Sequence, residues 1–217
     1  MRMRAKPWAT PELNACPFFL RDPFSLKNHW LEWFPVRQPL HLELGCSKGW
    51  FLAGMAPSHP KINFLGIDMK DAVLAPGKRK IEEAFGDRPI SNVALTAYDI
   101  ERLPDIMGPQ DLVERIYINF CNPWPRPRHH KRRLTHPRQL ELYKTILSPN
   151  GEIFFKTDDD ALFKDSLDYF GEAGFEIYEH TYDLHAENCP ENVLTEHEEM
   201  FMQKKIPIKA LKARRKA

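Results

Sequence analysis

A segment in the middle of the chain combines a rigid turn with concentrated positive charge. It has the sequence Asn-Pro-Trp-Pro-Arg-Pro-Arg-His-His-Lys-Arg-Arg-Leu at 122–134 and follows an apolar run at 115–120. Six Lys or Arg and no Asp or Glu lie between Arg126 and Arg138, a composition typical of a phosphate-binding surface. The apolar run has strand composition, so we expect the turn at the carboxyl end of a strand, where open α/β sheets bind ligands.

A run of like charges is often only a solvated face, and this alternative applies here too. We favour nucleic-acid binding, because His129 and His130 add further donors and the prolines stiffen the turn. Both histidines are expected to face RNA or to be structural, and neither is expected to bind metal. Trp124 could stack on a base, but a tryptophan between two prolines more often packs a turn in place, and we favour packing.

A glycine-containing turn near the start of the chain indicates a nucleoside cofactor. Residues 42–49 have the sequence Leu-Glu-Leu-Gly-Cys-Ser-Lys-Gly and lead into a helical stretch. Glycines let the backbone approach a nucleoside, and the Glu43 carboxylate could bind a cationic group or a ribose hydroxyl. Asp68 ends the next expected strand, where an acid can bind ribose hydroxyls. Asp99, after the third strand, is either an adenine contact or an ordinary turn cap.

The spacing of the glycines favours S-adenosylmethionine over NAD. The outer glycines of a dinucleotide fingerprint are five residues apart, whereas Gly45 and Gly49 are four apart. S-adenosylmethionine carries a sulfonium and an ammonium but no pyrophosphate, so an acid near the first turn suits it better than a phosphate cradle. Alone this turn is weak evidence, because both glycines could merely shape it while Glu43 pairs with a surface cation.

Short apolar runs alternate with helical stretches, which predicts an α/β fold with a parallel sheet wrapped by helices. Expected helices lie at 78–85, 137–147 and 161–173. The chain of 217 residues suits a single domain, with an irregular amino-terminal arm at about 1–38 and a basic carboxyl-terminal tail at about 204–217. Seven strands are expected, at 41–44, 63–68, 93–97, 115–120, 152–157, 175–180 and 199–206.

Charge and composition indicate which partners to expect and where in the cell the protein works. Seven Lys or Arg and no acid lie between Gln203 and Ala217, so this tail could bind RNA, pack on a sheet edge or stay disordered. No apolar stretch approaches the ~20 residues of a membrane helix, so we expect a cytoplasmic protein without a membrane partner. The four cysteines are widely separated and lack zinc-site spacing, which predicts reduced thiols and no metal.

Taken together, these motifs resemble the bacterial tRNA (guanine-N7)-methyltransferase family. The resemblance covers nearly the whole chain, and it implies a Rossmann-like class I methyltransferase fold, with a seven-stranded, mostly parallel sheet and helices on both faces. It also implies transfer of a methyl group from S-adenosylmethionine to N7 of the variable-loop guanosine, position 46, of tRNA. It rests on Leu-Glu-Leu-Gly at 42–45, Gly-Ile-Asp at 66–68, Tyr-Ile-Asn-Phe at 117–120, Asn-Pro-Trp-Pro at 122–125, Arg-His-His-Lys-Arg-Arg-Leu-Thr at 128–135, Phe-Lys-Thr-Asp at 155–158 and Thr-Glu-His-Glu at 195–198.

The same resemblance implies roles for individual residues. The cofactor contacts it implies are Glu43, Gly45, Asp68, Asp99 and Asn122. The substrate contacts it implies are Arg126, which stands where lysine is usual, Asp158, Thr195 and Glu198. The RNA contacts it implies are Arg128, His129, His130, Lys131, Arg132 and Arg133.

Two positions depart from the family pattern. Ser47 stands where the middle glycine of a Gly-x-Gly-x-Gly turn is usual, and Asn122 stands where Asp-Pro-Trp-Pro has its aspartate. The serine is tolerated if its backbone avoids positive φ, and its hydroxyl could cap the next helix. The asparagine bears on catalysis, because Asn122 is the candidate catalytic position.

Methylation of guanine N7 needs no general base, because N7 has a free lone pair. Positive charge develops on the purine, and a carboxylate at ~4 Å is worth about 4 kcal/mol at an effective dielectric of ~20, before desolvation. Asn122 keeps an acceptor without the charge, so we expect an active enzyme that relies on proximity, with Asp158 and Glu198 as compensating acids. The alternatives are a tRNA-binding relative with weakened catalysis and a methyltransferase of a small molecule or protein. The oligomeric state, monomer or homodimer, stays open.

Overall fold

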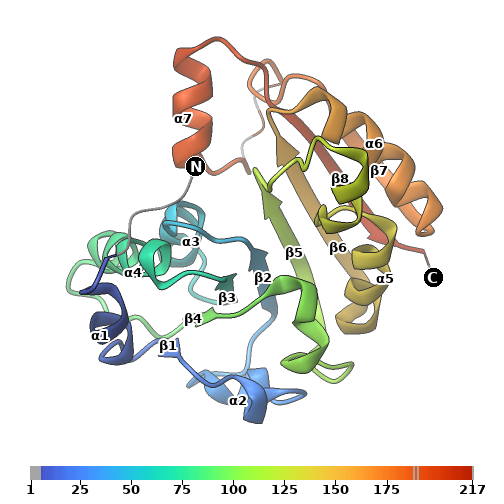
Figure 1. Ribbon diagram of the computed structural model, residues 1–217. Helices are drawn as coiled ribbons and strands as arrows, with labels where there is room; N and C mark the ends of the chain where they lie inside the picture. The colour runs from blue at the N-terminus through green and yellow to red at the C-terminus, as the bar shows by residue number, and fades with distance from the viewer. Residues whose placement is uncertain (1–5, 188, 190, 217) are drawn as a thin grey trace. The chain divides into compact units, whose positions relative to one another are not determined.

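The chain forms two compact units in a computed structural model that describes residues 6–187, 189 and 191–216. The amino-terminal unit is Met1–Asp111 and the carboxyl-terminal unit is Leu112–Ala217. Each contains strands and helices (Figure 1). Each unit is considered by itself below, and the single domain expected from the sequence stays a prediction.

Four parallel strands form the sheet of the amino-terminal unit. Their order is β1 (Phe19–Leu20), β4 (Val93–Ala97), β3 (Asn63–Asp68) and β2 (Leu40–Leu44). Every residue of β2 is buried, as expected for a parallel strand covered on both faces. The strands expected at 63–68 and 93–97 are confirmed, β2 begins one residue before the expected start, and β1 was not expected.

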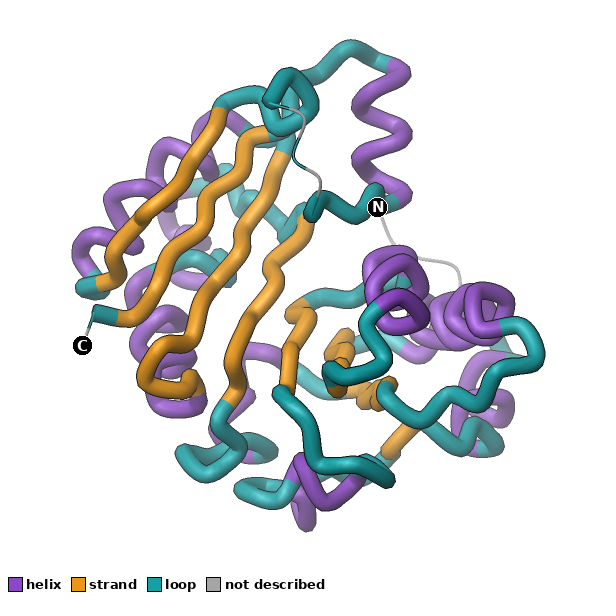
Figure 2. Tube along the Cα trace, turned by 180° about the vertical axis from the view of Figure 1, so that it is seen from behind, coloured by secondary structure: helices purple, strands orange, loops and turns teal. Residues whose placement is uncertain are grey.

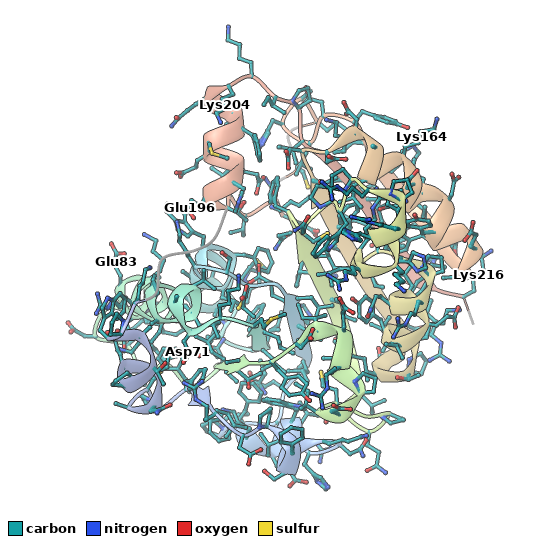
Figure 3. The ribbon with its side chains drawn as sticks, viewed as in Figure 1. Asp71, Glu83, Lys164, Glu196, Lys204 and Lys216 are labelled. Carbon is teal, nitrogen blue, oxygen red and sulfur yellow. The ribbon has the colours of Figure 1, made fainter. Side chains whose placement is uncertain are left out.

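The amino-terminal arm is more ordered than its sequence indicated. It contains α1 (Ala9–Asn14), η1 (Phe24–Leu26) and α2 (Trp30–Trp33) beside β1. Figure 1 shows α1 beside α4 (Asp71–Phe85), and ion pairs join Glu12 to Arg79 and Arg21 to Asp71, which Figure 3 labels. The arm therefore packs on α4. The unit is completed by α3 (Trp50–Met55), η2 (Ala56–Ser58) and η3 (Ile100–Asp105).

The carboxyl-terminal unit has a mixed sheet in the order β5 (Val113–Asn119), β6 (Leu147–Thr157), β8 (Lys209–Arg215) and β7 (Phe175–Thr181). The first two strands are parallel, and β8 runs antiparallel to both of its neighbours. The basic tail therefore forms a strand inside this sheet. The described residues thus contain eight strands rather than seven.

The strand expected at 199–206 is wrong. Residues Glu196–Gln203 form α7, which begins at a capping box in which Thr195 and Glu198 exchange side-chain and backbone hydrogen bonds. This motif satisfies two amides that a helix start would leave unpaired, so it favours a helix over a strand. The last strand starts instead at Lys209.

Two helices cover one face of the carboxyl-terminal sheet. They are α5 (Pro137–Ile146) and α6 (Asp160–Glu172), and Figures 1 and 2 place both on the same side of the strands. The opposite face carries half-exposed ion pairs, such as Arg115–Glu152 and Lys212–Glu179. Among the residues that the structure describes, no helix has the length and apolar character needed to span a bilayer.

Candidate functional site

The amino-terminal unit holds the first group of candidate residues, the glycine turn, residues 45–49, between β2 and α3. Gly45 and Gly49 have φ of +80° and +67°, in the left-handed region that glycine adopts without strain. The backbone N–H groups of Gly45 and Cys46 both donate to the Ile67 carbonyl, which ties the turn to β3. A Cβ added at Gly45 would meet no atom within 4 Å, so the backbone there borders open space.

Ser47 differs from the expectation. Its φ is +47°, so it adopts the left-handed conformation that a non-glycine residue was expected to avoid, at a cost of roughly 1 kcal/mol. No side chain caps α3, whose N-cap residue is Gly49, so the Ser47 hydroxyl does not act as the cap. Its backbone N–H instead donates to Asp68 Oδ2 at 3.1 Å, which compensates part of the strain.

The glycine turn packs directly against the backbone of α4. A Cβ added at Gly49 would lie 3.0 Å from both Cα and O of Gly77. A Cβ added at Gly77 would lie 3.0 Å from the carbonyl carbon of Lys48 and 3.1 Å from the nitrogen of Gly49. This contact requires glycine on both sides, so Gly77 is a supporting residue that sequence reasoning missed. The Pro-Gly pair at 76–77 was the available signal.

Three acids lie near the carboxyl ends of neighbouring parallel strands. Glu43 is 4% exposed within β2, Asp68 ends β3, and the register pairs Asp68 with Ala97, two residues before Asp99. Burial raises the pKa of Asp68 above its ordinary value, although the N–H groups of Lys70 and Ser47 oppose the shift. Asp99 Oδ1 accepts the N–H of Glu101 and caps η3, and the expected adenine contact of Asp99 stays a prediction.

This part of the molecule fits a cationic nucleoside. Carboxylates can accept from ribose hydroxyls or an ammonium and can balance a sulfonium, while open space at Gly45 leaves room for the nucleoside beside the backbone. Glu43, Gly45 and Asp68 are the residues that would hold S-adenosylmethionine. Among the described residues, no group of three or more His, Cys, Asp or Glu could hold a metal ion, and the expectation that the protein binds no metal stays a prediction.

The carboxyl-terminal unit holds the second group of candidate residues, the basic elbow, residues 122–134, which follows β5. Phe120 and Trp124 have φ of +52° and +42°, and Asn122 Oδ1 accepts the N–H of Trp124 at 3.0 Å. The side chain of Asn122 is exposed, and its oxygen holds the turn. The guanidinium of Arg132 lies 5.2 Å from the centre of the Trp124 ring, and His129 meets the ring edge-on. Trp124 thus packs the elbow, as we favoured.

The cations of the basic elbow divide into exposed and buried ones. Arg133 is 2% exposed, and it bonds to the carboxylate of Asp165 at 2.5 Å, the carbonyl of Pro123 at 2.7 Å and Nε2 of His130 at 3.1 Å. These bonds make Arg133 an internal clamp, which differs from the RNA contact expected for it. His129 and His130 are half-buried, and the exposed cations are Arg126, Arg128, Lys131 and Arg132.

The remaining expected substrate contacts lie near the carboxyl ends of β5 and β6 or at the start of α7. Asp158 is half-buried, and its carbonyl accepts from the buried Lys209 at 3.0 Å. Thr195 and Glu198 are brought together by the capping box, but both are buried, and Glu198 pairs with Lys156. Sequence reasoning missed Lys156 and Lys209. A lysine within an apolar strand segment, as in Phe-Phe-Lys-Thr at 154–157, was the only signal for Lys156.

Comparison with known proteins agrees with this geometry. Residues 37–211 match the model of a family described as "Putative methyltransferase". The tRNA (guanine-N(7)-)-methyltransferase of Clostridium beijerinckii is 54% identical over 213 residues, 97% of each chain. That of Clostridium perfringens is 52% identical over 218 residues, 99% of this chain and 100% of the relative.

A solved structure shows the same fold at low sequence identity. The 16S rRNA methyltransferase KamB aligns with a TM-score of 0.60 at 13% identity, over 99% of this chain and 96% of that one. The α/β, class I methyltransferase fold expected from the sequence is therefore confirmed. On the strength of the full-length similarity, this chain belongs to the tRNA (guanine-N7)-methyltransferase family.

Proposed function

We propose that this chain transfers the methyl group of S-adenosylmethionine to N7 of a guanine in tRNA, and that the guanine is position 46 of the variable loop. The observation that carries the proposal is similarity over nearly the whole chain to relatives named for this reaction, at 54% and 52% identity. The exposed cations of the basic elbow support a nucleic-acid substrate. A tRNA substrate also supports a cytoplasmic location.

For this methyl transfer, the protein mainly has to align the two reactants and balance their charge. The bound cofactor supplies an electrophilic methyl group on a sulfonium, and guanine N7 attacks with a lone pair that carries no proton. The residues therefore need to bind and orient rather than to move a proton. Glu43 and Asp68 hold the cationic nucleoside at the glycine turn, and the exposed Arg126, Arg128 and Arg132 bind RNA phosphates.

Asn122 has a positioning role in this proposal. Its Oδ1 holds the N–H of Trp124, so the Nδ2 amide is the group left to meet a ligand acceptor. Glu198 is a poor source of compensating negative charge, because the ammonium of Lys156 neutralises it at 2.5 Å. Asp158 is the remaining candidate acid in the carboxyl-terminal unit.

Methyl transfer from labelled S-adenosylmethionine to unmodified tRNA transcripts, with nucleoside analysis of the product, tests the function. We expect wild-type protein to form 7-methylguanosine, and a transcript with adenine at position 46 to accept no methyl group. Asn122→Asp is the matched variant, because an aspartate oxygen can also accept from Trp124. A faster Asn122→Asp enzyme would show that the missing charge limits the rate; absence of 7-methylguanosine with both proteins would refute the proposal.

The RNA-binding surface is tested by reversing one charge at a time. Arg132→Glu should weaken tRNA binding about tenfold near physiological salt and reduce the salt dependence of the affinity, because a phosphate contact is lost. Lys164→Glu changes the net charge equally at an exposed position of α6 and should have a much smaller effect. Equal losses in the two variants would mean that the protein attracts tRNA by overall charge instead of through the basic elbow.

A further inference from the structure

A buried lysine on β6 donates three hydrogen bonds to one segment of the chain. Lys156 is 7% exposed, and its Nζ donates to Asn192 Oδ1 at 2.9 Å, to the Val193 carbonyl at 2.9 Å and to Glu198 Oε2 at 2.5 Å. An ammonium has three protons to donate, and three acceptors of this one segment surround it. Lys156 therefore ties residues 192–198 to the carboxyl end of β6.

Glu198 is the centre of the same cluster. It is 0% exposed, and its Oε2 also accepts from the backbone N–H and the hydroxyl of Thr195, at 3.1 and 3.2 Å. Its Oε1 accepts from Asn192 Nδ2 at 2.8 Å, and His185 Nε2 lies 3.7 Å away. We call Lys156, Asn192, Thr195 and Glu198 the lysine clasp. Its carboxylate has no exposed surface to offer a substrate.

The lysine clasp provides the buried polar attachment of α7. Glu198 is the one buried residue of this helix, and Met200 and Met202 are exposed. The half-buried Phe201 adds an apolar contact, because its ring stacks on Phe120 with centroids 5.9 Å apart. Figure 1 shows α7 standing beyond the ends of β5 and β6, and Figure 3 labels Glu196 and Lys204 near its two ends. With so little of the helix buried, its position depends on the lysine clasp together with these ring contacts to Phe120.

The position of α7 matters for the basic elbow. The ring of His197, which is exposed, stacks on Phe120 with centroids 5.5 Å apart and an interplanar angle of 14°. Phe120 precedes Asn122 by two residues, and its N–H donates to the carbonyl of Lys156. The clasp thus places the first turn of α7 at the start of the elbow, at the end of the sheet where ligands bind.

We propose that Lys156 is a positioning residue for methyl transfer to tRNA, which acts through Glu198 to hold the first turn of α7 against Phe120 and the basic elbow. The proposal rests on the proposed function. An apolar pair of similar volume would hold two elements together at least as stably as a buried ion pair. The ion pair adds directional bonds to Asn192 and Val193, and these bonds define where the segment lies.

The test compares Lys156→Met, the double variant Lys156→Met with Glu198→Gln, and the control Lys144→Met. Lys144 is also a half-buried lysine in an ion pair, with Glu141 at 2.8 Å, but it lies on α5 and its partner belongs to the same helix. The double variant leaves no unpaired buried charge, so it separates stability from positioning. Steady-state kinetics on tRNA transcripts should be measured well below the unfolding temperature of every variant.

We expect both Lys156 variants to raise KM for tRNA about tenfold, since a displacement of about 1 Å in a binding group has effects of that order or larger. The double variant should recover most of the unfolding temperature lost in Lys156→Met. Trypsin should cleave after Lys204 or Lys205 faster in both, while Lys144→Met stays at wild-type values. A double variant with wild-type KM, kcat and trypsin resistance would overturn the proposal. A wild-type protein without methyl transfer would refute the proposed function, and the trypsin comparison would still decide the role of the clasp.

Discussion

The contact between the glycine turn and α4 predicts opposite outcomes for one substitution at two helical glycines. A Cβ at Gly77 would lie 3.0 to 3.2 Å from backbone atoms of residues 47–49. A Cβ at Gly171 in α6 would meet no atom within 4 Å. Backbone atoms of a tight turn cannot rotate away as a flexible side chain can. We therefore expect Gly77→Ala to destabilise the protein and Gly171→Ala to stabilise it.

The size of the difference follows from two opposing effects. Alanine is favoured over glycine inside a helix by roughly 0.5–1 kcal/mol, and this gain applies at both positions. Overpacking at Gly77 costs about 1–3 kcal/mol, so the net change there is a loss of about 1 kcal/mol. The two variants should thus differ by roughly 2 kcal/mol, or about 4–8 °C in unfolding temperature for a chain of this length.

Thermal unfolding followed by circular dichroism measures the change in stability. Calorimetric titration with S-adenosylmethionine measures the change in cofactor affinity. Displacing the glycine turn should weaken cofactor binding in Gly77→Ala, whereas Gly171→Ala should bind as wild type does. If Gly77→Ala unfolds at the same temperature as Gly171→Ala, or above it, the close approach of the turn to α4 is not present in the protein and the reasoning fails.

Three further predictions concern titration and buried charge. His136 caps α5 by accepting the N–H of Arg138, and burial lowers the pKa of this histidine below 6.5. The cap should therefore contribute its full stability above pH 6.5, and this contribution should fall as the pH drops through 6.5 toward the lowered pKa. Thermal melts should show this pH dependence for the wild type and not for His136→Asn. Burial raises the pKa of Asp68 above 3.8, so affinity for the cofactor should be highest above the raised pKa and decline as the pH falls through it. Calorimetry of Asp68→Asn should show weaker, pH-independent binding. Unchanged affinity in this variant would remove Asp68 from the site. Arg133→Met should cost about 2–3 kcal/mol in denaturant unfolding and Arg132→Met under about 0.5 kcal/mol, and equal costs would contradict the burial of Arg133.

The strands of the amino-terminal unit could be predicted because each is a short apolar run between turn residues. The expected bounds of β3 and β4 match the structure. The start of α4 was missed, because Pro76 and Gly77 usually interrupt a helix, whereas here the glycine is required by the turn that packs on it. A local pattern cannot reveal a requirement that comes from a segment about thirty residues earlier.

The error at α7 has a different cause. Residues 199–206 have the apolar content of a short strand, and Thr-Glu-His-Glu at 195–198 was treated as a ligand motif on the strength of its resemblance. The same four residues are a capping box, a known signal for a helix start. Only the burial of the side chains decides between the structural and the ligand-binding explanation of such a motif. The burial of Glu198 depends on its partner Lys156, which lies 42 residues away in the chain.

Adjacent cations in the basic elbow show a limit of the sequence-based prediction. The sequence predicts a group of RNA-binding cations, but it does not indicate which members of the group are exposed. Arg132 and Arg133 have the same charge and the same composition around them, yet one is exposed over Trp124 and the other is enclosed by Asp165 and Pro123. Asp165, the acid that pairs with Arg133, belongs to α6 and lies 32 residues away in the chain. Tertiary packing therefore decides which of the two arginines is buried. The enclosed cation holds the elbow in one shape, and that shape presents the exposed cations together. Removing Arg133 should therefore reduce tRNA affinity as well as stability, even though its guanidinium has almost no surface for a phosphate to contact.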